Sequence, residues 1–284
     1  MVDALATAAG PVGGAASGAG AAHPVASGCH IFSGCGYPAP GLGSFDFQPI
    51  FKIGSFGFTK PMLIALLVAI IVVGFFWFAF SKPKLVPRGA QNVGEMGVLF
   101  IRDQILRPMT GKKGDKFLPY LVSLFFFIWL MNLMELIPFF QFPVPARSGF
   151  VWNLVVITWV SYMYIGIRTH GPIGFFRYLV PKGVPWWILP LLAPVVIVSD
   201  IILRPFTLGV RLFANMFAGH LLLLVFYLAT WYFLSVGVGL VLAAGSFVMV
   251  LVITGFELLI QFLQAFIFTI LTAFYIGDSM AEAH

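Results

Sequence analysis

The sequence predicts an all-α membrane protein with about five transmembrane helices, an interfacial amphipathic helix and a long, tilted helical hairpin at its C-terminal end. Composition is the first reason: 60% of the 284 residues are apolar, only 9% are charged, and the mean hydropathy is +1.00. Soluble globular domains do not have this composition. The second reason is that apolar runs of about 20 residues, the length that crosses a bilayer, recur along the chain.

The first 45 residues are rich in Ala, Gly, Ser and Pro and carry almost no charge. They lack the basic stretch and following apolar stretch of a cleaved signal peptide, so we expect an irregular external tail at 1–45, followed by a membrane domain at 46–284. Cys29 and Cys35 lie in this tail, where a disulfide and two separate thiols are equally compatible with an external location. Two cysteines are too few for a structural zinc site, and we expect neither a metal nor a cofactor.

Apolar runs near 61–81, 118–140 and 150–167 each suffice for one crossing. A longer apolar region extends from about 188 to 276, and a Gly-containing stretch at 235–239 divides it into two helices. Between the first two runs, residues 91–108 are expected to form a helix that lies on the cytoplasmic interface.

Basic residues are concentrated in the loops 82–116 and 168–187, whereas 141–149 holds only Arg147 and the turn near Val238 holds none. The positive-inside rule therefore places the N-terminus and that turn outside, and the C-terminus in the cytoplasm. The formal net charge of +6 arises largely from these loops, so it does not indicate nucleic-acid binding.

The long C-terminal region carries polar residues at the depth of the membrane. Arg211 lies in the apolar stretch GVRLFANMFAGHLLLL, where a permanent cation costs about 2.5–3.5 kcal/mol by insertion scales. An antiparallel hairpin folded near Val238 would place polar residues in mirrored pairs: Arg211 with Gln264, Asn215 with Gln261, and His220 with Glu257. Such residues mark a functional site by default.

Helical periodicity assigns these side chains to faces. Arg211 and His220 are nine residues apart and point to opposite sides, whereas Arg204 shares a face with Arg211. Asp200 precedes Arg204 by four residues, the favourable order for an ion pair within one helix. Arg211 has no acid at its level, and we infer that its counter-charge comes from another chain.

Three segments resemble signature sequences of subunit a of the F-type ATP synthase, the membrane stator that faces the rotating c-ring. They are Val210–His220 (VRLFANMFAGH), Glu257 followed by Gln264–Phe268 (QAFIF), and Phe127–Pro138 (FIWLMNLMELIP). The resemblance covers roughly residues 60–280. The long tail and the SKPKLVP loop look most like actinobacterial members.

The resemblance implies a proton-conducting subunit of the bacterial cell membrane, which binds the c-ring, b-type peripheral stalk subunits and lipid and performs no ATP chemistry itself. It makes Arg211 the essential stator arginine and places His220 and Glu257 in a half-channel. Asn215, Gln261 and Gln264 join the proton-translocating set. Secondary candidates are Glu135, Asp200 and Arg204; many relatives carry a glutamate where this chain has Val196.

Other interpretations remain open at this stage. Glu135 either reaches the outer interface or lines the outer path, and Gln261 either ties helices together or carries protons. A secondary transporter is the main alternative function, but internal duplication is not evident. An intramembrane enzyme would need a catalytic motif, and the sequence contains no HExxH, GxSxG or P-loop motif. The coupling ion is not determined by these residues.

Overall fold

The computed structural model describes residues 37, 51–53, 56–137, 144, 148–171, 174–175, 187–234 and 237–280. The predicted tail at 1–45 lies outside these residues, apart from Tyr37, and so do Cys29 and Cys35. The hydroxyl of Tyr37 donates a hydrogen bond of 2.6 Å to the carbonyl of Val225, and its ring meets that of Tyr232 edge-on at 5.8 Å.

Two short strands precede the first helix, which the sequence analysis did not anticipate. Strands β1 (Phe51–Ile53) and β2 (Phe56–Phe58) pair antiparallel, with Phe51 opposite Phe58. Helix α1 follows at Lys60–Phe80, with Pro61 in its first turn, where a missing N–H is tolerated. Its 21 residues correspond to about 31 Å, close to the thickness of the hydrocarbon core.

The segment predicted as an interfacial helix is helical from residue 90 to residue 110. It consists of α2 (Ala90–Phe100), a π-helical stretch (Ile101–Leu106) and α3 (Arg107–Thr110). One side is fully buried through Ile101, Ile105 and Leu106, whereas the other carries exposed ion pairs that join Arg102 and Arg107 to Asp103. The predicted helix is therefore confirmed and is amphipathic. A short 3-10 helix (Lys112–Phe117) leads into the next span.

Helices α4 (Leu118–Leu133) and α5 (Ser148–His170) form the second and third spans. The predicted run at 118–140 is longer than the helix, because α4 gives way to a turn at 134–136, shortly before Pro138. A residue that precedes proline disfavours the helical conformation. This turn places Glu135 at the end of α4.

The C-terminal region forms the predicted hairpin. Its first arm combines α7 (Leu189–Val198), a π-helical stretch (Ser199–Leu203) and α8 (Arg204–Phe233), and its second arm is α9 (Val238–Met280). The turn lies where it was predicted, and Gly237 adopts a left-handed φ of 89° there, which glycine tolerates without strain. Five helices of the described chain are long and apolar enough to cross a membrane, which confirms the fold class.

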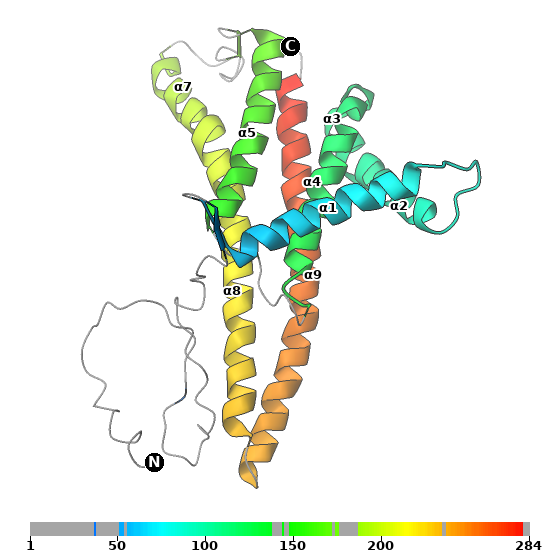
Figure 1. The fold of residues 1–284 in the computed structure, drawn as a ribbon. Coiled ribbons are helices and arrows are strands. Elements are labelled where there is room, and N and C mark those ends of the chain that lie inside the picture. Colours follow the sequence, from blue (N-terminus) through cyan, green and yellow to red (C-terminus); the bar gives the residue numbers. More distant parts are fainter. Residues whose placement is uncertain are drawn as a thin grey trace.

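Figure 1 shows α8 and α9 running antiparallel beside each other, while α1 crosses them at a steep inclination. The 43 residues of α9 correspond to about 64 Å, roughly twice the thickness of the hydrocarbon core. A single bilayer therefore accommodates the hairpin only if it is strongly tilted or projects from the membrane.

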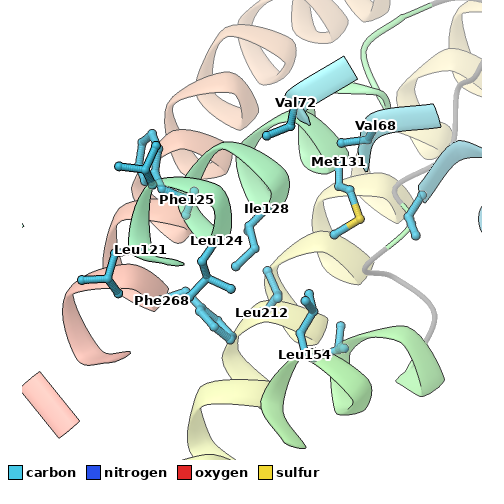
Figure 2. Packing of buried hydrophobic residues seen from close by; sticks show 14 of the residues in the cluster. Val68, Val72, Leu121, Leu124, Phe125, Ile128, Met131, Leu154, Leu212 and Phe268 are labelled. Carbon is cyan, nitrogen blue, oxygen red and sulfur yellow. The ribbon is translucent and has the colours of Figure 1, made fainter. Parts of the chain in front are cut away.

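Helix α5 packs against both arms of the hairpin, and α4 packs against α9. Figure 2 shows the packed centre, in which Ile128 of α4 and Leu212 of α8 are fully buried, as is Phe268 of α9. Leu212 is the neighbour of Arg211 in sequence. The buried face of α8 is thus fixed by this core, and Arg211, about 100° further round the helix than Leu212, lies outside that face.

Candidate functional site

Arg211 lies on an exposed stripe of α8. Leu208, Leu212 and Met216 are buried on an adjacent face of the same helix, whereas Arg211 is exposed. Within the described part of the chain, Arg211 makes no hydrogen bond and no ion pair. The stripe continues through other exposed residues, several of them small: Thr207, Ala214, Asn215 and Ala218. Small side chains allow another helix to approach closely.

The nearest polar link between the two arms joins Asn215 to α9. Its Nδ2 donates a hydrogen bond of 2.9 Å to Oε1 of Gln264, which is only 1% exposed. The predicted mirrored pair of Asn215 with Gln261 is wrong by about one helical turn, because Asn215 binds Gln264 instead. The physical reason is a third helix: Gln261 turns toward α4 and binds there instead.

Four polar residues nearer the turn between α8 and α9 form what we call the outer cluster: Glu135, His220, Glu257 and Gln261. Nδ1 of His220 lies 2.9 Å from Oε1 of Glu135, and Nε2 of Gln261 donates to Oε2 of Glu135 over 3.4 Å. Glu257 lies within electrostatic range of His220, as the mirrored pair predicted, and Glu135 of the α4 turn is a further partner of the imidazole that the prediction did not include. Glu135 itself is buried, with 5% exposure.

Glu257 completes the outer cluster from α9. It is 3% exposed, lies within electrostatic range of Glu135 and His220, and neither carboxylate oxygen meets hydrogen-bond geometry with a partner among the described residues. Its close neighbour on α8 is Gly219, where a Cβ would lie 2.4 Å from Oε1 of Glu257. Because glycine at position 219 has no side chain, the carboxylate of Glu257 can occupy the adjacent space.

Asn132 of α4 was not identified as a site residue from the sequence. It is fully buried, and its Nδ2 donates to the backbone carbonyl of Gln261 over 3.4 Å. The sequence did contain a signal for a role of Asn132. Asn132 and Glu135 are three residues apart at the end of an apolar run, so their side chains face the same way. Buried polar groups require partners, and this spacing supplies them from one helix.

A second ionic group lies on the other side of Arg211, at the ends of the two arms that are far from the turn between α8 and α9. Nε of Arg204 lies 2.9 Å from Oδ1 of Asp200, and its Nη1 lies 2.9 Å from Oδ2 of Asp278. The ion pair predicted between Asp200 and Arg204 is present, whereas Asp278, in the last turn of α9, was missed. The mirror relation places residues near 272 opposite Arg204, so it does not identify Asp278.

The geometry separates three elements along the hairpin: an outer cluster that can bind and pass protons, an exposed guanidinium, and an inner ionic group. Among the described residues, no group of His, Cys, Asp and Glu has the arrangement of a metal site. Imidazole and carboxyl groups can each take up and release a proton, whereas a guanidinium does not give up its proton.

Comparison with known proteins agrees with this arrangement. Residues 62–277 match the model of the family described as ATP synthase A chain. The subunit a of the ATP synthase of Streptomyces lividans is 48% identical over 90% of this chain and 92% of the relative. That of Rhodococcus erythropolis is 41% identical over 87% and 92%, respectively. With five apolar helices and bacterial relatives, the protein is a multi-pass bacterial membrane protein. The chain therefore belongs to the ATP synthase subunit a family, which serves proton transport in ATP synthesis.

Proposed function

We propose that the chain is the proton-conducting stator subunit of an F-type ATP synthase, with two offset half-channels and an arginine that couples proton flow to rotation of the c-ring. The observation that carries the proposal is the exposed position of Arg211, without an ion pair in the described chain, between two separate ionisable groups. A cation at this depth needs a counter-charge, and a carboxylate on the rotor would supply it.

The chemistry of arginine explains the coupling step. The guanidinium attracts a carboxylate only when that carboxylate has lost its proton, and the attraction is strong in a medium of low dielectric constant. Arginine keeps its own proton, so it cannot pass protons directly from one half-channel to the other. Each rotor carboxylate would then release its proton on one side of Arg211 and take up another only after it had passed.

The outer half-channel would run through the outer cluster. His220 and Glu135 are in hydrogen-bond contact at 2.9 Å, and Glu257 and Gln261 line the same buried space from α9. His220 lies nine residues from Arg211, about 13 Å along the axis. The link between Asn215 and Gln264 lies between them, so a polar path extends from the outer cluster toward the level of Arg211.

The inner half-channel would open near Arg204 and Asp200, about 10 Å and about 16 Å from Arg211 along the axis in the opposite direction. The N-terminus and the turn between α8 and α9 would face outside and the C-terminus the cytoplasm, because the basic loops are then inside. The c-ring, b-type stalk subunits and lipid would be the partners. ATP chemistry would belong to other subunits of the complex.

The test is Arg211→Ala in the assembled complex in inverted membrane vesicles. We expect ATP-driven proton pumping to fall about 100-fold, the scale observed when one electrostatic stabilising group is removed. Arg107→Ala is the matched control, because Arg107 is also an exposed arginine but belongs to α3. Normal pumping with Arg211→Ala would refute the proposal.

A further inference from the structure

Arg204 connects two helices that are far apart in sequence. Its guanidinium contacts Asp200, four residues earlier on the same arm, and Asp278, which lies 74 residues later in α9. Both N–O distances are 2.9 Å, and the three side chains are only partly exposed, at 29%, 13% and 34% for Arg204, Asp200 and Asp278. Arg204 thus binds one carboxylate on each arm and links α9 to the N-terminal end of α8.

The backbone at this point is unusual and is supported by α5. Residues Ser199–Leu203 form a π-helical stretch, in which the wider turn changes the hydrogen-bonding pattern of the carbonyls. The hydroxyl of Tyr162 donates to the carbonyl of Asp200 over 3.2 Å, and Nε1 of Trp159 donates to the carbonyl of Ile201 over 3.0 Å. Side chains of α5 therefore hold the irregular stretch from which Arg204 emerges.

Two tyrosine rings complete this group of side chains around Arg204. The guanidinium of Arg204 lies 5.4 Å from the ring centre of Tyr275, and that ring packs against Tyr162 at 5.5 Å. The space left between these side chains is about 10 Å³, close to the minimum for one water molecule. We call Tyr162, Asp200, Arg204, Tyr275 and Asp278 the inner clasp. It joins α5, α8 and α9 in a close-packed unit.

The inner clasp lies next to the part of α8 that carries Arg211. From Arg204 onward α8 is a regular α-helix, and Arg211 follows after seven residues, on the same face and about 10 Å along the axis. Because two turns of regular helix are stiff, the position of Arg204 fixes the depth and rotation of Arg211. Inside a bilayer, moreover, helices gain little from hydrophobic burial, so polar ties are among the forces that set their register.

We propose that Asp278 is a positioning residue for Arg211: through Arg204 it fixes the register of α9 against α8, and thereby sets the depth and rotation at which Arg211 meets its partner. This inference rests on the proposed function, in which Arg211 attracts a rotor carboxylate. Displacement of Arg211 by a fraction of a turn would weaken that contact and allow protons to pass without rotation.

The test compares Asp278→Ala with Asp103→Ala in the assembled complex. Asp103 is the matched control because it also bridges arginines, Arg102 and Arg107, but belongs to the interfacial helix. The first readout is the number of protons pumped per ATP hydrolysed in inverted vesicles. The second is disulfide cross-linking between a cysteine at Ala214, on the exposed stripe beside Arg211, and cysteines placed along the carboxylate-bearing helix of the c subunit.

We expect Asp278→Ala to lower the pumping ratio about fivefold to tenfold, the scale on which residues that act at a distance modulate coupling. The cross-links should spread over neighbouring rotor positions. Asp278→Glu, which restores a carboxylate, should recover most of the pumping ratio, and Asp103→Ala should behave like the unaltered complex. Arg204→Gln combined with Asp278→Ala should be no worse than Arg204→Gln alone, because the two residues would act as one unit.

An unchanged pumping ratio and an unchanged cross-link pattern in Asp278→Ala would overturn the inference. A lower amount of complex with an unchanged ratio and pattern would overturn it too, because that result describes a purely structural residue. Arg211→Ala in the same assay separates the two proposals. If it pumps normally, the proposed function is wrong; if it does not pump while Asp278→Ala does, only the positioning role is wrong.

Discussion

A methyl group at position 219 would collide with the carboxyl group of Glu257 in the outer cluster. A Cβ built on Gly219 lies 2.4 Å from Oε1 and 3.2 Å from Cδ of Glu257. Ordinary contact between a Cβ and such an atom begins at 3.4 Å, so the carboxyl group must move by about 1 Å. Glu257 is 3% exposed and has little space into which to move.

The magnitude of the effect follows from this geometry. Overpacking a tightly packed site costs about 1–3 kcal/mol, and each 1.4 kcal/mol changes a rate or an equilibrium about tenfold. If the displaced carboxyl group leaves the proton path, we expect Gly219→Ala to lower ATP-driven proton pumping about tenfold. ATP hydrolysis by the detached catalytic sector should not change, because the substitution lies within the membrane.

The assay is acidification of inverted vesicles that contain equal amounts of assembled complex. Gly74→Ala in α1 is the matched control, since a Cβ there meets nothing within 4 Å. Combining Gly219→Ala with Glu257→Asp, which shortens the acid by one methylene, should restore part of the pumping. Equal pumping by Gly219→Ala and Gly74→Ala would refute the reasoning.

Two further substitutions test the packing of the hairpin. Gly277→Ala would place a Cβ 2.6 Å from the backbone carbonyl oxygen of Met109, which cannot turn aside as a side chain can, so the amount of assembled complex on native gels should fall clearly below that of Gly74→Ala. Asn215→Leu and Gln264→Leu should show a coupling of about 0.6–1.7 kcal/mol in a double-mutant cycle on detergent-induced unfolding of the complex, and additive effects would exclude a stabilising role for their 2.9 Å hydrogen bond.

The spans, the interfacial helix and the turn of the hairpin were predictable because each depends on a local property. Helix α1 begins and ends within a residue of its predicted run at 61–81, since hydropathy and span length alone determine it. The turn near Val238 follows from glycine at 237, which adopts a left-handed φ of 89°. The strands β1 and β2 escaped prediction, since three-residue strands carry too few positions for a pattern.

The pairings within the site were less predictable because they involve a third helix. The prediction of mirrored pairs treats α8 and α9 as an isolated pair of helices. It therefore assigned Glu257 to His220 and Gln261 to Asn215. Helix α4 inserts Glu135, which binds both His220 and Gln261. Tertiary contacts of this kind join residues 85 and 126 positions apart, and no periodicity within one helix reports them.

The same comparison explains why Asp278 was missed. The sequence offered Arg204 a partner four residues away, and one ion pair sufficed to account for its charge. The structure gives it a second carboxylate, together with a π-helical stretch that changes the direction of the residues before Arg204 relative to those after it. Helical spacing predicted the pair of Asp200 with Arg204 correctly, but it reports only partners on the same helix and not a carboxylate on α9.

The order of groups along the hairpin bears on how the two proposed proton paths would remain separate. Between the link of Asn215 with Gln264 and the inner clasp, much of the space between α8, α9 and their neighbours is occupied by apolar residues that are at most 2% exposed, among them Leu208, Leu212, Ala265 and Phe268. Close-packed apolar side chains leave little room for a continuous chain of water. A proton that passes this level would therefore leave the protein interior for the exposed stripe, where Arg211 lies. That stripe faces away from the packed core, so conduction past this level would require the partner that covers it.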